Sequence, residues 1–286
     1  MRDFTTFVRN HLGSICTLQE MNQISLVLLE KLAEIDKLQF YSRKDMKIPA
    51  HKAAILRDAV LRLEKNEPLQ YVIGETEFSG LSFNVRPGVL IPRPETEELV
   101  EKVVNDSKYF SEGKSSIKIV DLCSGSGCIA ISLSKLLVGS VVEAWEISNV
   151  AIEIAKENSS KNNTNVLFKQ IDVLNYDIAE ELFETIDLMI SNPPYVCRSE
   201  QSEMEEKVLN NEPHIALFVE NDDPLIFYRK IAFIADKILK KGGYLYFEIN
   251  SLLWKETLNL LESFNFTKIE VFKDISNRER FIRIQK

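Results

Sequence analysis

Short apolar segments alternate with segments of helical periodicity from about residue 95 onward, and this alternation constrains the fold more than any other feature. Such alternation is typical of a doubly wound, mostly parallel α/β sheet, in which ligands bind at the carboxyl ends of the strands. Two further apolar segments near the C-terminus predict a terminal β-hairpin. The predicted strands are 117–122, 141–147, 166–171, 186–191, 244–249, 266–273 and 280–285, and the predicted helices are 128–137, 151–159, 225–239 and 251–264.

The first part of the chain lacks this alternation of strand and helix patterns. Residues 1–68 show helical periods and little strand signal, which predicts a small bundle of three to five helices. This region holds 11 Lys and Arg against 9 Asp and Glu, whereas the remainder holds 24 against 34. Residues 69–94 contain strand-like segments at 71–73 and 81–85 beside glycine and Pro-Gly turn signals, and they predict a β-hairpin linker. We therefore expect three parts, the last of which is 95–286.

A glycine-rich turn follows the first strand of the α/β region. Glycine lets the backbone pass close to a ligand, and a helix N-terminus offers unpaired N–H groups and positive potential. The spacing differs from the GxGxxG of dinucleotide sites, so the pattern by itself is a weak signal. Glu146 ends the next strand about 20 residues later, where it can accept hydrogen bonds from both hydroxyls of a ribose. The residues of the turn are Asp121, Leu122, Cys123, Ser124, Gly125, Ser126 and Gly127.

The strand at 186–191 is followed by Asn192, Pro193, Pro194 and Tyr195. Two consecutive prolines fix φ and hold the preceding residues extended, so that the carbonyls of Asn192 and Pro193 are free to accept hydrogen bonds. The Asn192 side chain adds a further acceptor, and Tyr195 adds a flat apolar face. Together they suit a planar NH2 group, because two acceptors hold its hydrogens while a ring lies against it. The alternative interpretation is a Pro-Pro loop that merely ends a strand.

These features together resemble the class I S-adenosylmethionine-dependent methyltransferases that act on planar amino or amide nitrogens. Two segments narrow the resemblance to the release factor glutamine methyltransferases, namely 89–101 (VLIPRPETEELVE) and 67–74 (EPLQYVIG). Residues 212–217, and Lys273 and Asp274 followed by Arg280, also stand where that family has similar segments. The resemblance covers nearly the whole chain.

The resemblance implies a seven-stranded Rossmann-like sheet and S-adenosyl-L-methionine as the cofactor. It implies methylation of the side-chain amide nitrogen (N5) of the glutamine in the Gly-Gly-Gln loop of class I peptide chain release factors, which the N-terminal region helps to bind. The catalytic residues implied are Asn192, Pro193, Pro194 and Tyr195. The cofactor contacts implied are Asp121, Cys123, Ser124, Gly125, Ser126, Gly127, Glu146, Asp172, Val173 and Asn192. The basic residues expected to steer the release factor are Arg43, Lys44, Lys47, Lys52, Arg57, Arg62 and Lys65.

Four positions depart from the pattern of that family. Cys123 stands where the family often has glycine, and Glu146 replaces the more usual aspartate. Val173 follows Asp172 where the family often has an aromatic residue beside the adenine. Asn250 stands where the family commonly has glycine, and we interpret it as a packing or turn residue.

Composition limits the choice of partners and compartment. The formal charge is -8 and the sequence pI is about 5.2, which does not suit stable binding to a phosphate backbone. The four cysteines form no CxxC pair and the three histidines are far apart, so we expect neither a metal site nor a disulfide framework. The sequence shows no signal peptide and no apolar run of about 18 residues, so we expect a cytoplasmic protein without a membrane span.

Three other functions stay open from the residues alone. A nucleic-acid methyltransferase acting on adenine N6 or guanine N2 would use the same Asn-Pro-Pro-Tyr chemistry. The acidic α/β region and the lack of a basic recognition segment count against it. An NAD-binding oxidoreductase would need a different glycine spacing. A protein that binds S-adenosylmethionine without catalysis would keep the motif without using it.

Overall fold

The computed structural model describes residues 1–43 and 45–286. The chain divides into two compact units, each with a hydrophobic core of its own. The first unit comprises Met1–Glu75 and Glu205–Asn211, and the second comprises Thr76–Met204 and Glu212–Lys286. Within the described residues, no helix combines the length and the hydrophobicity that a membrane crossing requires.

The first unit is helical, as the periodicity of residues 1–68 predicts. Its core consists of aliphatic and aromatic side chains, of which Leu12, Leu28 and Leu56 are completely buried. Thr17 and Glu20 form a capping box that starts the second helix and satisfies two of its N–H groups. The helices of this unit are α1 (Arg2–Leu12), α2 (Leu18–Ala33), α3 (Lys37–Ser42), α4 (Ala50–Glu64), α5 (Leu69–Ile73) and α10 (Glu206–Asn211).

The predicted strand at 71–73 is wrong, because these residues belong to the helical turn α5. Gly74 ends this turn in a left-handed conformation with φ of 86°, and its N–H bonds to the carbonyl of Gln70. An apolar run as short as this one is compatible with either a helix or a strand. The hairpin of the linker begins later, with β1 (Glu75–Phe78) and β2 (Leu81–Asn84).

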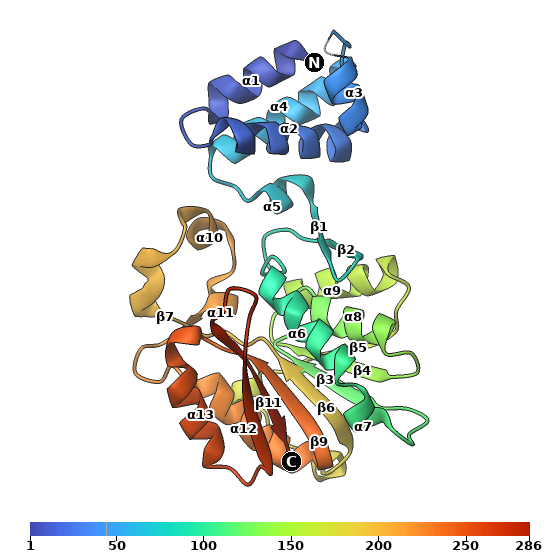
Figure 1. Cartoon of the computed structure of the whole chain (residues 1–286), viewed down its shortest axis with the longest axis vertical. Coiled ribbons are helices and arrows are strands. Elements are labelled where there is room, and N and C mark those ends of the chain that lie inside the picture. Colours follow the sequence, from blue (N-terminus) through green and yellow to red (C-terminus); the bar gives the residue numbers. More distant parts are fainter. Residues whose placement is uncertain (44) are drawn as a thin grey trace. The chain divides into compact units, whose positions relative to one another are not determined.

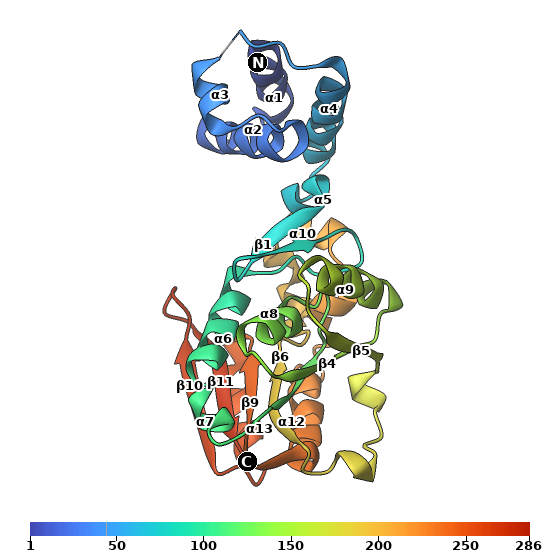
Figure 2. The same ribbon diagram turned by 90° about the vertical axis from the view of Figure 1, so that its right-hand side faces the viewer.

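The second unit is built on a seven-stranded sheet with the strand order β10-β11-β9-β6-β3-β4-β5, which Figure 2 shows from one edge to the other. The five strands from β9 to β5 pair in parallel, whereas β11 runs antiparallel to both β9 and β10. The sheet therefore confirms the predicted parallel core and terminal hairpin. The strands are β3 (Lys118–Leu122), β4 (Val141–Glu146), β5 (Val166–Gln170), β6 (Ile186–Ser191), β9 (Leu239–Glu248), β10 (Lys268–Lys273) and β11 (Glu279–Gln285). A separate pair consists of β7 (Val196–Cys197) and β8 (Phe218–Val219).

Helices cover both faces of this sheet (Figure 1). The helices α6 to α9 lie on one face, where Leu99 and Ile131 join the core. The helices α12 and α13 lie on the other face, where Ile231 and Leu261 are completely buried. This arrangement is the doubly wound fold that the sequence predicts. The helices are α6 (Pro94–Asn105), α7 (Lys108–Ser111), α8 (Cys128–Leu136), α9 (Asn149–Lys161), α11 (His214–Leu217), α12 (Ile226–Ile238) and α13 (Trp254–Glu262).

The helix predicted at 225–239 is confirmed to within one residue, and the Lys-Lys-Gly-Gly sequence at 240–243 follows its end. The helix α12 ends at Ile238, and the next residue, Leu239, already pairs with β6. The following residue of β9 that pairs with β6 is Tyr244, so residues 240–243 bulge out of the ladder. Lys240 uses this bulge to reach the buried carboxylate of Asp187, with Nζ 2.9 Å from Oδ1. Lys240 therefore compensates the buried charge of Asp187 at the sheet.

Candidate functional site

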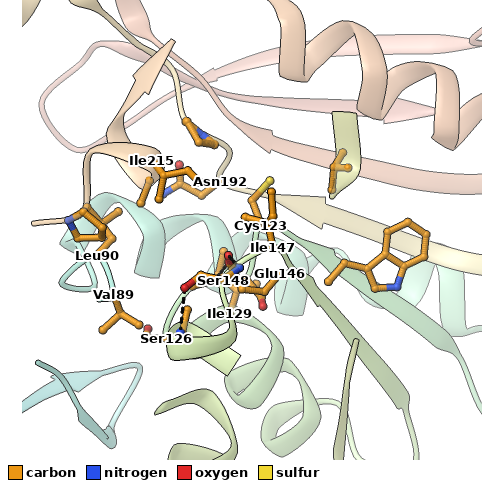
Figure 3. Close-up of a pocket in the computed structure, with 18 of the residues that line it drawn as sticks. Val89, Leu90, Cys123, Ser126, Ile129, Glu146, Ile147, Ser148, Asn192 and Ile215 are labelled. Carbon is orange, nitrogen blue, oxygen red and sulfur yellow. Dashed lines mark hydrogen bonds between the residues drawn. The ribbon is translucent and has the colours of Figure 1, made fainter. Parts of the chain in front are cut away.

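The carboxyl ends of β3, β4, β5 and β6 meet at one cavity of the second unit (Figure 3). It contains about 1110 Å³ of empty space, part of which is open to solvent. The predicted site residues that line it are Cys123, Ser124, Gly125, Ser126, Glu146, Asp172, Val173, Asn192 and Pro194. Among the described residues, those predicted for the site but lying outside the cavity lining are Asp121, Gly127, Pro193 and Tyr195.

The two glycines of the turn between β3 and α8 serve different purposes. Gly125 and Gly127 have positive φ values of 53° and 78°. A Cβ atom on Gly127 would lie 3.1 Å from Ala155 Cβ and 3.1 Å from Ile131 Cδ1, whereas one on Gly125 would meet nothing within 4 Å. The absence of a side chain at Gly127 thus lets α8 pack against α9. At Gly125 it leaves the backbone bare at the cavity.

We expect Gly127→Ala to destabilise the protein more than Gly125→Ala. Both substitutions place a side chain at positive φ, which costs about 1–2 kcal/mol for an L-residue. The alanine at position 127 also crowds its neighbours, and overpacking typically costs a further ~1–3 kcal/mol. Urea denaturation of both variants measures the free energy of unfolding. Equal losses of stability would show that the packing of α8 does not depend on this glycine.

Asp121 lies beneath the turn rather than in the cavity wall. It is completely buried, and its Oδ2 accepts a hydrogen bond of 3.1 Å from the backbone N–H of Ala130 in α8. Burial raises the pKa of this carboxyl well above its usual range, and the charge of Glu146 adds to the rise. These contacts favour a role in ordering the turn and the first turn of α8. A direct cofactor contact of Asp121 stays a prediction.

Cys123 and Ser124 differ in what they offer to a ligand. Cys123 has φ of 62°, and burial raises the pKa of its thiol well above the usual range, so the thiol stays protonated. This favours packing over a redox or nucleophilic role. Ser124 is buried at the cavity, and its Oγ has no hydrogen-bond partner among the described residues. Because buried hydroxyls are nearly always paired, this enclosed and unpaired Oγ is an exception among the residues of the site.

Glu146 ends β4 at the cavity, where it is only 9% exposed. Its Oε2 accepts a hydrogen bond of 2.8 Å from the N–H of Gly125, and its Oε1 accepts one of 2.9 Å from the N–H of Ser148. These two bonds fix the carboxylate at the cavity floor (Figure 3). Each oxygen keeps a lone pair for another donor, so the two hydroxyls of a ribose fit this carboxylate.

Asp172 and Val173 form another part of the wall, after β5. Asp172 starts the 3-10 helix η1 (Val173–Asn175), since its Oδ1 accepts the N–H of Leu174 at 3.0 Å. Val173 is buried and replaces the aromatic residue that the family often has. The cavity lining also contains the aliphatic residues Ile129, Ile147, Ile171 and Leu174, which offer an apolar surface to a flat ring.

The Asn-Pro-Pro-Tyr segment continues from β6 into the cavity wall. Asn192 lines the cavity, and its Nδ2 donates a hydrogen bond of 3.0 Å to Oγ1 of Thr96. Tyr195 packs against the core on the α12 side, and its hydroxyl donates to Oε1 of Glu248 at 3.1 Å. The position of Tyr195 therefore does not support the expected role of its ring as a flat face against a substrate amide.

Sequence reasoning assigned no site role to two segments that complete the wall. The first runs from Gly88 to Thr96, and the second includes Pro213, Ile215 and Ala216. Buried Glu212 joins the two segments, since its carboxylate accepts the N–H of Ile91 at 3.0 Å and Nη2 of Arg93 at 2.6 Å. The only signal for these residues was their resemblance to family segments, because neither has a local pattern of catalytic chemistry.

Comparisons with known proteins fit this geometry. Residues 108–215 match the family described as methyltransferase small domain, and residues 21–74 match the PrmC N-terminal domain. The chain is 40% identical to the release factor glutamine methyltransferase of Bacteroides thetaiotaomicron over 282 residues, which cover 99% of each chain. This chain belongs to the release factor glutamine methyltransferases. It is also 39% identical to the Flavobacterium psychrophilum protein of the same name, over 99% of this chain and 98% of that one.

Solved structures show the fold of this release factor glutamine methyltransferase in other enzymes. The hMettl16 catalytic domain, solved in complex with the MAT2A 3'UTR hairpin 6, has a TM-score of 0.53 at 17% identity over 82% of each chain. The T. thermophilus 16S rRNA methyltransferase RsmC, solved with AdoMet and guanosine, has a TM-score of 0.52 at 18% identity. That match covers 74% of this chain and 49% of the other. At such identities the matches establish the fold alone, and the methyl donor follows from the methyltransferase family.

Proposed function

We propose that this chain transfers a methyl group from S-adenosyl-L-methionine to the side-chain amide nitrogen (N5) of the glutamine in the Gly-Gly-Gln loop of class I peptide chain release factors. The observation that carries the proposal is the place of Asn192, which lies in the wall of the same cavity as Glu146 and the glycine-rich turn (Figure 3). An acceptor for a planar amide and a set of groups for a nucleoside are thus parts of one site.

The chemistry requires positioning more than activation. An amide nitrogen is a poor nucleophile, because its lone pair is delocalised into the carbonyl group. S-adenosylmethionine supplies, when bound, a methyl group that is already activated on a sulfonium. The protein must align the amide, and alignment of this kind contributes about 7–11 kcal/mol. Asn192 lines the cavity and accepts one of the two amide hydrogens, which orients the nitrogen and stabilises the positive charge that develops on it. The Pro193 carbonyl, expected from the sequence as the second acceptor, belongs to a residue outside the cavity lining, so its role stays a prediction.

Two features of the cavity support its assignment to the cofactor. The carboxylate of Glu146 suits the ribose, and the aliphatic residues of the lining suit the adenine. We propose that Asp121 and Gly127 stabilise the turn between β3 and α8. The proposed cofactor contacts are Cys123, Ser124, Gly125, Ser126, Glu146, Asp172, Val173 and Asn192.

We assign a separate role to each of the three predicted parts of the sequence. Residues 1–68 would bind the release factor, 69–94 would link, and 95–286 would carry the methyltransferase activity. The match of residues 21–74 to a separate N-terminal domain supports a function of its own for the helical region. The compact units divide later, after Glu75, and the first unit also takes in the helix α10.

Some of the basic residues expected to steer the release factor form ion pairs within the helical unit instead. Lys52 donates to Oε2 of Glu34 at 2.7 Å, and Arg62 donates to the carboxylate of Glu67, so both stabilise the helical unit. Lys44 lies outside the described residues. The residues that we keep for the steering surface are exposed, namely Arg43, Lys47, Arg57 and Lys65.

We expect reversal of the charges at Arg43, Lys47 and Lys65 to glutamate to lower kcat/KM for intact release factor by about tenfold at low salt. The loss should shrink at high salt, because exposed charges are screened. Activity on a short Gly-Gly-Gln peptide should not change. Methylation assays at two ionic strengths measure this, and the same reversal at Lys156, Lys268 and Lys273 of the second unit is the control. Equal losses for both substrates would assign the effect to the catalytic site instead of docking.

One assay tests the function itself. Purified protein is incubated with S-adenosylmethionine labelled in its methyl group and with release factor, with release factor whose Gly-Gly-Gln glutamine is replaced, or with DNA and RNA. Label on the intact release factor alone supports the proposal, and we then also propose a cytoplasmic location, where translation takes place. Label on nucleic acid would favour the adenine N6 or guanine N2 alternative. Binding of cofactor without transfer to either would favour a non-catalytic protein.

A further inference from the structure

A network of buried hydrogen bonds holds the side chain of Asn192. Its Nδ2 donates to Oγ1 of Thr96 at 3.0 Å, and the Thr96 hydroxyl donates to Oε2 of Glu248 at 2.7 Å. The other carboxylate oxygen, Oε1, accepts the hydroxyl of Tyr195 at 3.1 Å. Thr96 and Glu248 are only 2% and 1% exposed, so water does not substitute for these partners. This hydrogen-bond network joins the start of α6 and the end of β9 to the segment after β6.

The donors and acceptors in this network determine the orientation of the Asn192 amide. A threonine hydroxyl has one hydrogen, and here that hydrogen goes to the carboxylate of Glu248. Thr96 can then only accept from Asn192, and an amide donates through its NH2 group. The NH2 group of Asn192 is therefore held at Thr96. The Oδ1 atom is left for a ligand of the cavity that Asn192 lines.

We propose that Thr96 and Glu248 are positioning residues for methyl transfer, which hold the Asn192 amide with its oxygen toward the N–H of the substrate amide. This inference rests on the proposed function, and it assigns a role to two buried residues outside the Asn-Pro-Pro-Tyr motif. A rotated Asn192 would present its NH2 group to the cavity, and two NH2 groups would then face each other. The site would keep its cofactor but would not orient the substrate nitrogen.

The protonation state of Glu248 decides whether this orientation holds. Ionised Glu248 can only accept hydrogen bonds, which gives the network described above. Protonated Glu248 can donate to Thr96, whose hydroxyl can then donate to the Asn192 oxygen, and the amide would rotate. Burial raises the pKa of Glu248, while the hydrogen bond from Thr96 and the charge of Arg280 oppose the rise. The ionisable groups around Glu248 are Glu95, Cys128, Tyr195, Tyr228 and Arg280.

The sign of the pH effect follows from the raised pKa. The competent, ionised form of Glu248 predominates above its folded-state pKa and is lost as the pH falls through that value. We therefore expect kcat of the wild-type protein to fall on the acid side through one ionisation. Circular dichroism at each pH separates this fall from acid unfolding.

The test compares Thr96→Val, which removes the hydroxyl at nearly constant volume, with Thr96→Ser, which keeps it. We expect Thr96→Val to lower kcat on release factor by about tenfold, with KM and the affinity for S-adenosylhomocysteine within about twofold of wild type. Thr96→Ser should recover most of the loss. The control is Thr257→Val, since Thr257 of α13 is also buried but donates to the carbonyl of Leu253, the residue before α13, and lies outside the cavity lining. Calorimetry with S-adenosylhomocysteine and thermal unfolding separate positioning from loss of the fold.

A second variant keeps the inference testable if Thr96→Val fails to fold. Glu248→Gln cannot ionise, so the acid limb of the kcat profile should disappear in this variant. Wild-type kcat in Thr96→Val, or an acid limb that persists in Glu248→Gln, would overturn the positioning role. Failure of the wild-type protein to methylate release factor would instead overturn the proposed function, so the two failures are distinguishable.

Discussion

Asn192→Ala is expected to lower kcat for methylation of release factor by about 10²–10³-fold, the usual loss when one preorganised polar contact to the reacting group is removed. The substitution removes the acceptor Oδ1 from the cavity wall and leaves Glu146 and the glycine-rich turn in place. The affinity for S-adenosylhomocysteine should therefore stay close to that of the wild type. Steady-state methylation kinetics and calorimetry measure the two quantities separately.

The matched control is Asn165→Ala, which truncates an exposed asparagine just before β5. It should leave both quantities unchanged. Wild-type turnover in Asn192→Ala would remove Asn192 from the mechanism, together with the positioning role proposed for Thr96 and Glu248. A loss of cofactor affinity as large as the loss of turnover would show that Asn192 acts chiefly in the cofactor site.

The second large effect is expected at Glu146, which lines the same cavity. Glu146→Gln should weaken the binding of S-adenosylmethionine and of S-adenosylhomocysteine alike, by about 1.5–3 kcal/mol, which is roughly 10- to 150-fold in affinity. The wild-type carboxylate accepts the N–H groups of Gly125 and Ser148 and still has lone pairs for a ribose. A glutamine has a single acceptor oxygen, so its NH2 group must face one of these backbone donors.

Isothermal titration calorimetry with both ligands measures this prediction. Glu153→Gln is the matched control, because Glu153 lies on the neighbouring helix α9 and has an exposed side chain outside the cavity lining. It removes the same charge without touching the site. Unchanged affinity in Glu146→Gln would rule out the ribose contact. Loss of affinity for one ligand alone would place Glu146 near the sulfur, where the two ligands differ.

The strands and the glycine-rich turn could be read from the sequence, since each depends on neighbouring residues. The run at 186–191 is mostly apolar, and all residues of β6, Asp187 and Ser191 included, are buried in the structure. Glycines at 125 and 127 indicated a backbone that approaches a ligand, and Gly125 does donate its N–H at the cavity. A short run such as 71–73 failed, because its apolar residues satisfy a helical turn as well as a strand.

The sequence by itself determined the doubly wound fold, the four strand ends that form the cavity, and the family, because these follow from local periodicity and contiguous motifs. Only the tertiary structure decided what surrounds Asn192. Thr96 and Glu248 are 152 residues apart, and Tyr195 turned out to bond with Glu248 instead of lining the cavity. Hydrogen bonds between such distant residues leave no periodic trace in the sequence. They arise only when the sheet places the end of β9 beside the end of β6 and the start of α6 across them.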